Sequence, residues 1–402
     1  MTEMDSTLAG SAASLNAVNF AAGLPQHLLI AQEVNIGVVR ELVPPQEHIG
    51  LSIAPWLDVA ADDVVFDYLR DSTTGMTPAR AQDAESTLWA DTEFYGGQGR
   101  ASIIDWAEKN AYSTSDVTGY REMLPIVEQI TGKGAKLPFY ISSMVEGFAG
   151  KIARHSIQRR RRLDNRIEWL IMEAMSKGYI EYQDKRVKFK VDFKRPADQH
   201  DQALADYTGD SHDPIGDLMA AQKKVYDRTG VTLNRGEIST AAISTWYKSK
   251  WFRGLTGFRP GDVAPAEMPY IMPGFGPQVA IDAVEAATGI KFRITDNVLR
   301  TRGTRAGGRE TAVNRRYFPA DQVILYASGD QISAYDDTEI GFAKTLTSPH
   351  PANDWATGFY GWERNLGVDP YGYEVGSGVK AFPIFPHMEL TYTMRVGGIP
   401  SA

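Results

Sequence analysis

The sequence predicts an α+β fold with more than one domain, and three observations lead to that prediction. The chain has 402 residues, which is enough for two or three domains that each bury a core of their own. Its longest apolar periodicity is helical and covers residues 141–177. Strand patterns lie on both sides of this helix and alternate with shorter helices further along the chain, which is typical of domains that mix helices and sheets.

The composition is that of a folded protein, and it restricts the functions that the chain can have. Hydrophobic residues make up 43% of the chain and charged residues 23%, unlike a disordered sequence. Cysteine is absent, which excludes disulfides, thiolate metal sites and cysteine nucleophiles. The net charge of −8 argues against a broad surface that wraps nucleic acid. The sequence has no signal-peptide pattern and no apolar run near the ~18 residues that cross a bilayer, so we expect a soluble protein made in a reducing cytoplasm.

The N-terminal part of the chain contains two extended segments. Residues 1–45 are rich in small side chains and lack a sustained apolar period, so we expect an extended or partly helical arm, with a disordered tail as the alternative. Strand patterns follow at 64–69 and 99–106, separated by about 30 polar and small residues. A connection of that length is uncommon inside one compact domain, which indicates that residues 60–112 have a role outside it.

The periodic region is predicted to form one helix that runs into a β-hairpin. A helix over 141–177 would be on the order of 50 Å long at about 1.5 Å per residue. Gly178 lies where a cap glycine is expected, and Lys177 lies at the negative end of the helix dipole. Polar and apolar residues then alternate through 179–193 around a turn at 183–185, which predicts a hairpin with one buried face.

A second domain is predicted over residues 214–345. Asp213 and Pro214 favour the start of a helix, because Asp caps an N-terminus and Pro fits the first turn. Helix and strand patterns then alternate, and the clearest are a helix at 277–288 and an apolar strand at 323–326.

The C-terminal residues 375–396 return to strand-like composition. Pro383 and Pro386 interrupt this pattern, and proline donates no ladder hydrogen bond. We therefore expect an edge strand or a bent pairing there.

Two basic stretches are candidates for contact with other molecules. One stretch of the predicted long helix, residues 154–162, carries five arginines: Arg154, Arg159, Arg160, Arg161 and Arg162. They form either a solvated helix face or a polar contact with acidic residues of a neighbouring subunit. The second stretch carries three arginines between glycines: Arg302, Arg305 and Arg309. The glycines favour a mobile, solvated loop, with acidic partners or DNA as alternatives for the arginines.

No pattern of catalytic residues is apparent. The seven histidines are scattered and none forms a helical His-x-x-x-His pair, which disfavours a metal site. His212 lies beside Asp213 and near Asp210, and a polar cluster at a helix start explains this group better than a metal site does. The chain has no Walker loop, no dinucleotide-binding glycine pattern and no Gly-x-Ser-x-Gly elbow. We therefore expect a protein without enzyme activity, cofactor or bound metal.

Three stretches follow one another in a recognisable order along the chain. They are Glu173-Ala174-Met175-Ser176-Lys177-Gly178-Tyr179-Ile180, Arg186-Val187-Lys188-Phe189-Lys190-Val191-Asp192-Phe193 and Asp213-Pro214-Ile215-Gly216-Asp217-Leu218. This order resembles the phage lambda type of major capsid protein, the capsid protein E family, within the capsid fold shared by tailed phages and herpesviruses. The likeness spans most of residues 40–398, and the order of the motifs is more specific than any single motif.

The resemblance implies a major capsid protein that self-assembles as pentamers and hexamers into the icosahedral shell around the double-stranded DNA of a tailed phage. It implies a set of structural parts: an N-terminal arm (1–45), a peripheral domain (46–213) with an extended loop (about 60–112), a spine helix (about 141–177) and a hairpin (about 179–193), an axial domain (214–345) and a return to the peripheral domain (346–402). Thr74 and Met76 of the extended loop and the arginines named above are then candidate contacts between subunits.

The implied partners and location follow from the same resemblance. The chain would bind copies of itself, a separate scaffolding protein, a portal protein and possible decoration proteins. It would enclose DNA without sequence-specific binding, contact no membrane, and reside in the virion after assembly in the host bacterial cytoplasm. Two other readings stay open: another virion subunit, such as a portal, tail or decoration protein, and an α+β enzyme of unknown class.

Overall fold

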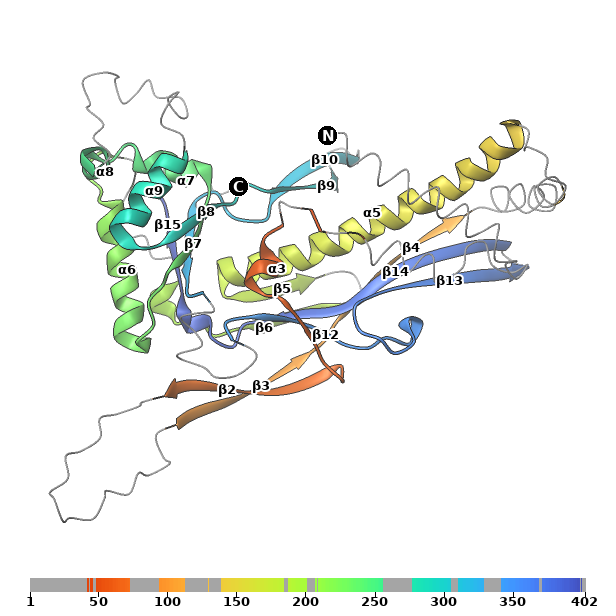
Figure 1. Ribbon diagram of the computed structural model, residues 1–402, viewed down its shortest axis with the longest axis horizontal. Helices are drawn as coiled ribbons and strands as arrows, with labels where there is room; N and C mark the ends of the chain where they lie inside the picture. The colour runs from red at the N-terminus through yellow and green to blue at the C-terminus, as the bar shows by residue number, and fades with distance from the viewer. Residues whose placement is uncertain are drawn as a thin grey trace, which may run out of the picture.

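The computed structural model describes most of the chain and shows an elongated molecule. The described residues are 42, 44–45, 48–72, 94–112, 129, 139–183, 187–200, 207, 209–255, 277–304, 310–328, 341–368, 371–397 and 399. Figure 1 shows a group of short helices over one sheet at one end, and a long helix beside a second sheet that extends to the other end. The described part therefore has mixed helices and sheets, as the α+β prediction requires.

The long helix α5, Phe139–Lys177, confirms the predicted spine helix and begins two residues earlier than expected. Its 39 residues correspond to a length of roughly 60 Å. One face buries apolar side chains at helical spacing: Ile152, Leu163, Ile167, Leu170, Ile171 and Met175. The helix ends at Gly178, whose φ of 78° is left-handed and whose N–H donates to the carbonyl of Ala174. Only glycine adopts that conformation without strain, which explains why the helix stops there.

The predicted hairpin is also present. It consists of β5, Tyr179–Gln183, and β6, Lys188–Asp192, paired antiparallel from Tyr179↔Asp192 to Gln183↔Lys188. Tyr182 and Phe189 stack on one face with ring centroids 5.4 Å apart. Trp106 of β4 (Asp105–Tyr112) packs edge-on against Tyr182 at 5.1 Å, so the face that was expected to be covered packs against the larger sheet.

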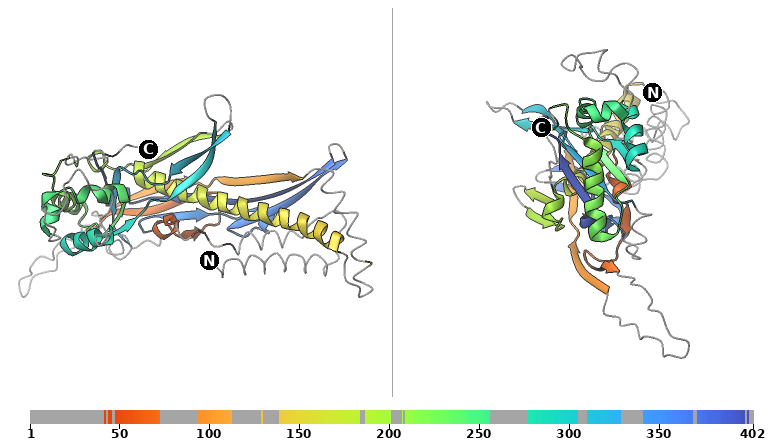
Figure 2. Two further views of the ribbon diagram at one scale, coloured as in Figure 1. Left: turned by 90° about the horizontal axis from the view of Figure 1, so that it is seen from above. Right: turned by 90° about the vertical axis from the view of Figure 1, so that its left-hand side faces the viewer.

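A five-stranded sheet lies beside α5 along much of its length (Figure 2). Its strands are β1 (Trp56–Asp58), β12 (Lys344–Thr347), β14 (Tyr371–Ile384), β13 (Phe359–Val368) and β4 (Asp105–Tyr112). The long strand β14 pairs with β13 and β4 through residues 371–380, and with β12 alone through residues 381–384. Pro383 lies in the stretch with a single ladder partner, which agrees with the edge-strand expectation.

A four-stranded sheet forms the core of the helical end. In spatial order its strands are β15 (Thr391–Arg395), β11 (Gln322–Tyr326), β7 (Arg235–Ile238) and β8 (Lys291–Ile294). The helices of this end are α6 (Pro214–Thr229), α7 (Thr240–Trp246), α8 (Lys250–Leu255) and α9 (Pro277–Thr288). The predicted helix at 277–288 and strand at 323–326 are thereby confirmed. Asp213 caps α6 as predicted, because its carboxylate accepts a hydrogen bond from the N–H of Gly216 at 3.0 Å.

Strand pairing crosses the domain boundary that was expected at residue 345. The boundary falls inside β12, which pairs with β1 and β14 of the five-stranded sheet. Residues 346–402 do not return as a whole to that sheet, because β15 pairs with β11. Both β11 and β15 are almost fully buried, so β15 completes the four-stranded core although it is remote from it in sequence.

Two antiparallel ribbons are sheets of their own within the described chain. The first is β2, Asp63–Ser72, with β3, Phe94–Ser102, and it projects away from the rest of the molecule in Figure 1. The strand expected at 99–106 is wrong in extent, because the chain changes partner after Ser102: β3 pairs with β2 whereas β4 pairs with β14.

The second ribbon corrects the prediction of a mobile loop around residues 301–309. Strands β9, Val298–Thr304, and β10, Glu310–Arg316, pair along seven positions from Val298↔Arg316 to Thr304↔Glu310. The β-branched valines and threonines of both strands favour extended pairing and outweigh the single glycine of β9. Within this ribbon, the connecting residues 305–309 lie outside the described chain. Residues 1–41 of the expected N-terminal arm and residues 73–93 between β2 and β3 also lie outside it.

Candidate assembly surfaces

The polar residues before the start of α6 have separate partners. His212 is buried, its Nε2 lies 3.0 Å from the carbonyl oxygen of Thr245, and its ring stacks on Tyr207. Asp210 forms an ion pair with Lys250 at 2.8 Å. Among the residues that the structure describes, no group of three or more His, Asp or Glu side chains could hold a metal ion. In the same part of the chain, no helix is long and apolar enough to cross a membrane.

The arginine run of α5 is divided between the interior and the surface. Arg159 is 1% exposed and joins α5 to the five-stranded sheet. It donates hydrogen bonds to Ser377 of β14 at 3.0 Å, to Asn110 of β4 and to Ser156 of its own helix. Neutral oxygens therefore replace the hydration of this guanidinium, and burial lowers its pKa.

Arg160 is buried too, but its partner is a carboxylate. Its Nε lies 3.0 Å from Oδ1 of Asp164 one helical turn later, and its guanidinium lies 3.3 Å from the centre of the Phe359 ring. Burial raises the pKa of Asp164 and lowers that of Arg160, because the loss of hydration disfavours the charged form of each side chain. The attraction between the two charges acts in the opposite direction and maintains the ion pair. Arg159 and Arg160 are therefore not part of a solvated helix face.

The other arginines of the run remain on the surface. Arg154 and Arg161 are exposed, and Arg162 forms an exposed ion pair with Glu108 of β4 at 2.9 Å. Burial lowers the pKa of His155, and the positive charges of Arg159, Lys151, Arg154 and Arg162 lower it further. This stretch of α5 therefore carries a positive potential around His155.

The remaining candidate contacts are only partly placed by the structure. Arg302 is a residue of β9 and pairs in register with Ala312 of β10. Arg305 and Arg309 lie in the connection between those strands, and Thr74 and Met76 in the connection between β2 and β3, all outside the described residues.

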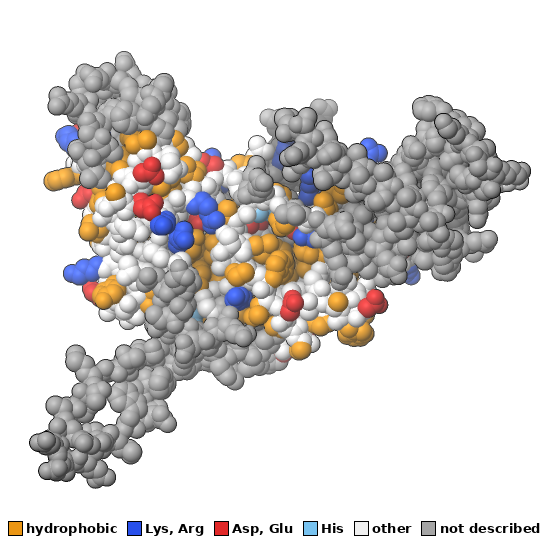
Figure 3. All heavy atoms as spheres, viewed as in Figure 1, with side chains coloured by type: hydrophobic (Ala, Val, Ile, Leu, Met, Phe, Trp, Pro, Cys, Tyr) orange, Lys and Arg blue, Asp and Glu red, His pale blue; other side chains and the backbone are white. Residues whose placement is uncertain are grey.

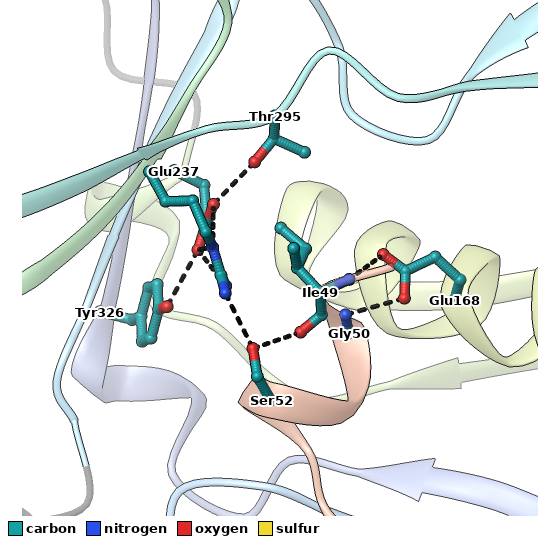
Figure 4. A network of polar contacts seen from close by, with 8 residues as sticks. Ile49, Gly50, Ser52, Glu168, Glu237, Thr295 and Tyr326 are labelled. Atoms are coloured by element: carbon teal, nitrogen blue, oxygen red, sulfur yellow. Dashed lines mark hydrogen bonds and ion pairs between the residues drawn. The ribbon is translucent and has the colours of Figure 1, made fainter. Parts of the chain in front are cut away.

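A chain of polar contacts that the sequence did not reveal joins the spine helix to the four-stranded sheet (Figure 4). It begins at Glu168 of α5, which is 2% exposed. Its carboxylate accepts hydrogen bonds from the backbone N–H groups of Ile49, at 3.0 Å, and Gly50, at 2.8 Å. These amides lie at the start of the short helix α3, Gly50–Ile53. A Cβ at position 50 would lie 2.6 Å from Glu168 Oε2, so the contact requires glycine there.

The other end of this chain of contacts is Glu237 of β7, which is 1% exposed. Its carboxylate accepts hydrogen bonds from Arg293 of β8 at 2.7 Å, from Thr295 at 2.7 Å and from Tyr326 of β11 at 3.0 Å. Arg293 also donates to Ser52 of α3 at 2.9 Å, and Ser52 donates to the carbonyl of Ile49 at 2.6 Å. The four residues of α3 are thus tied to α5 on one side and to the sheet on the other.

We expect Arg160→Ala to lower the free energy of unfolding by about 3–5 kcal/mol, because it leaves the Asp164 carboxylate buried without its partner. Urea denaturation followed by circular dichroism measures this change. Arg161→Ala is the matched control at the next position, where an exposed side chain is lost and the change should stay within about 0.5 kcal/mol. Equal effects of the two substitutions would contradict the assignment.

We expect Glu168→Gln to change how stability depends on pH. Burial raises the pKa of Glu168 above 4.5 in the folded chain, so the unfolded chain loses this proton first as the pH rises. From about pH 4.5 upward through the raised value, ionisation of Glu168 lowers the free energy of unfolding of the native chain. The free energy of unfolding of the native chain minus that of the variant should therefore fall as the pH rises. Urea denaturation between pH 4.5 and 8 measures this difference. A constant difference would show that Glu168 keeps its ordinary pKa.

Comparison with known proteins adds one family match. The family model for phage major capsid protein E matches residues 136–250, which contain α5, the β5–β6 hairpin, α6, β7 and α7. No curated protein sequence matches the chain.

Several solved structures are similar to the chain at low identity. A phage-related protein of Bordetella bronchiseptica RB50 is 14% identical, with a TM-score of 0.49 over 92% of this chain and 98% of that one. A prophage protein of E. coli CFT073 is 10% identical, with a TM-score of 0.49 over 96% and 98%. A chain of the cyanophage P-SCSP1u capsid is 9% identical, with a TM-score of 0.41 over 86% and 87%.

All three TM-scores are below 0.5, so these similarities carry no conclusion about function. The family match falls on the same spine helix, hairpin and Asp213-capped helix on which the resemblance was based. The resemblance predicted from the sequence is thereby confirmed: over residues 136–250 this chain matches the phage major capsid protein E family, which supports the function of a capsid shell protein.

Proposed function

We propose that this chain is the major capsid protein of a tailed phage, which assembles as pentamers and hexamers into an icosahedral shell around double-stranded DNA. The observation that carries the proposal is the family match to the long helix, the hairpin and the first helix of the helical end. A family match of this kind points to a structural protein, and we propose accordingly that the chain has no enzyme activity.

The two ribbons support a protein that works as one of many copies. The β2–β3 and β9–β10 ribbons are each two-stranded sheets, separate from the two larger sheets. An isolated two-stranded ribbon is marginally stable in water and gains stability when another surface covers it. In a shell, a neighbouring subunit supplies such a surface. Segments that extend onto a neighbour add buried interface area without requiring a larger core in either subunit.

The structural parts of the proposed shell subunit follow the folded units with one adjustment. The arm would be residues 1–45, and the peripheral domain would contain α5, the hairpin and the five-stranded sheet. The axial domain would contain α6 to α9 and the four-stranded sheet, including β15 from the C-terminal part of the chain. This domain would lie nearest the five-fold and six-fold axes.

Three of the five candidate arginines at positions 154–162 can serve as contacts with acidic residues of a neighbouring subunit. Arg154, Arg161 and Arg162 are exposed on α5, whereas Arg159 and Arg160 are buried. Contacts between exposed charges set the orientation and partner of an interface more than its affinity. We therefore propose that this face of α5 orients neighbouring subunits.

Further partners complete the proposal. A separate scaffolding protein, a portal protein and possible decoration proteins would join the shell in the host bacterial cytoplasm, and the product would be the virion capsid. The DNA inside would be enclosed without sequence-specific contacts, which is consistent with the net charge of −8.

Imaging of the expressed chain tests the proposal. We expect size-exclusion chromatography to give either particles or pentamers and hexamers, and electron microscopy to show closed shells. Rings of twelve subunits would instead support a portal protein. A monomer that converts a substrate would support the enzyme alternative, and either result would overturn the proposed function.

We expect the double substitution Arg154→Glu and Arg161→Glu to reduce the yield of closed shells roughly tenfold or more, because like charges across an interface cost several kcal/mol. Shells are counted by electron microscopy and separated by sedimentation. The control is Arg154→Lys with Arg161→Lys, which keeps both charges and should assemble normally. Both variants should unfold at the same temperature as the native chain, and unchanged assembly of the glutamate variant would rule out this contact.

A further inference from the structure

The β9–β10 ribbon lies in the part of the chain where positive charge is most concentrated outside α5. Residues 298–316, which contain both strands and their connection, include six arginines and no lysine, and Glu310 is their single acidic residue. Six arginines against one glutamate give this segment a formal charge of +5, whereas the whole chain has a charge of −8. The positive charge is therefore a local feature of the ribbon in an otherwise acidic chain.

One face of the ribbon is directed away from the body of the molecule. Leu299 packs toward the hydrophobic core, whereas its neighbours Val298 and Arg300 are exposed. Successive positions of a strand alternate between its two faces, so positions 298, 300 and 302 share the outer face. The right-hand view of Figure 2 shows the ribbon projecting from the body, and Figure 3 shows Lys and Arg side chains on the surface around it.

Strand β10 contributes to the same outer face. Residues opposite each other in an antiparallel pair lie on one face, so Arg316, opposite Val298, and Asn314, opposite Arg300, belong to it. Arg316 forms an ion pair with Asp296 at 2.9 Å. Among the described residues, Arg300 has no ion pair. Its guanidinium is therefore available to an anion from outside the chain.

The composition of the ribbon favours phosphate over an acidic protein surface. Aromatic and large apolar side chains anchor protein interfaces, and residues 298–316 contain no Trp, Tyr, Phe or Met. Every cation of the segment is an arginine, whose planar guanidinium can bind two phosphate oxygens at once. Positions 300 and 302 are about 7 Å apart along the strand, and the phosphates of one DNA strand recur about every 3.4 Å of helix axis. The two arginines can thus contact separate phosphates.

The size of the ribbon suits duplex DNA. The major groove is about 12 Å wide and admits a two-stranded β-ribbon, whose strands are about 4.8 Å apart. The net charge of −8 argues against a broad surface that wraps DNA, but a single ribbon on each subunit needs no such surface.

We propose that the outer face of the β9–β10 ribbon binds the phosphate backbone of double-stranded DNA, independently of base sequence, through Arg300 and Arg302. Each copy supplies few contacts, so binding is weak for one subunit and accumulates over the many copies of a shell. The proposal rests on the proposed function, because the shell holds the duplex that these copies meet.

The test is the binding of a short fluorescein-labelled DNA duplex to the unassembled fraction of the purified full-length chain. Fluorescence anisotropy measures the binding constant between about 50 and 200 mM salt, where each phosphate contact contributes about −0.9 to the slope of its logarithm against the logarithm of salt concentration. We expect Arg300→Ala/Arg302→Ala to make this slope shallower by about 1.8 and to weaken binding roughly tenfold or more at the lowest salt.

Two matched variants serve as controls. Arg300→Lys/Arg302→Lys keeps both charges and should keep the slope of the native chain. Lys223→Ala/Lys248→Ala removes two exposed cations outside the ribbon and should bind as the native chain does. All three variants should unfold at the temperature of the native chain, since the substituted side chains lie on the surface.

Five results would overturn the proposal. They are the absence of DNA binding by the native chain, equal slopes for the native chain and Arg300→Ala/Arg302→Ala, the same loss of slope in Lys223→Ala/Lys248→Ala, a strong preference between two duplexes of unrelated sequence, and arginine-dependent binding of polyglutamate that is tighter than that of the duplex. The last result would assign the ribbon to an acidic surface of a neighbouring subunit.

Failure of this proposal can be distinguished from failure of the proposed function. Closed shells formed by a chain that does not bind DNA would reject the ribbon site and retain the capsid function. DNA binding with the expected change of slope, by a chain that forms no shells, would retain the ribbon site and reject the capsid function.

Discussion

The arrangement of the two sheets depends on a pair of buried carboxylates that hold α3 between them. Glu168 binds the first amides of α3 from the spine helix, and Glu237 binds Arg293, which in turn binds Ser52 of α3. Buried carboxylates are stable only with a full set of hydrogen-bond donors, so each one selects a single position for its partners. Because α3 is four residues long, it has little internal freedom to absorb a shift of either side. The spine helix and the four-stranded sheet are thus connected through defined polar contacts as well as through apolar packing.

The arginine run of α5 shows how one helix serves the interior and the surface at once. Four consecutive residues cover more than a full helical turn, so they necessarily point in different directions. Arg159 and Arg160 turn inward and bind β4, β14 and Asp164, while Arg161 and Arg162 remain outside. Arg159 and Arg160 hold α5 against the sheet. Arg161 and Arg162 are therefore exposed on a helix whose position is fixed. A contact surface on α5 is rigid for this reason.

The same division applies to the molecule as a whole. Both sheets and their helices form buried cores, whereas the β2–β3 ribbon extends beyond them. In the proposed shell the ribbon would be available to neighbouring copies, because every subunit presents the same surfaces.

The sequence by itself determined the elements whose signals are local. The apolar period, Gly178 and Asp213 defined the spine helix and the start of α6, and alternation defined the β5–β6 hairpin, because helix periods, caps and short turns depend on neighbouring residues. The order of these elements was also sufficient for the family resemblance. Only the tertiary structure decided that β15 joins β11, that residues 298–304 pair with 310–316 and that Arg159 and Arg160 are buried. It alone brought Glu168, Glu237 and α3 together, since contacts between residues more than a hundred positions apart are chosen by packing in three dimensions and leave no periodic trace in the chain.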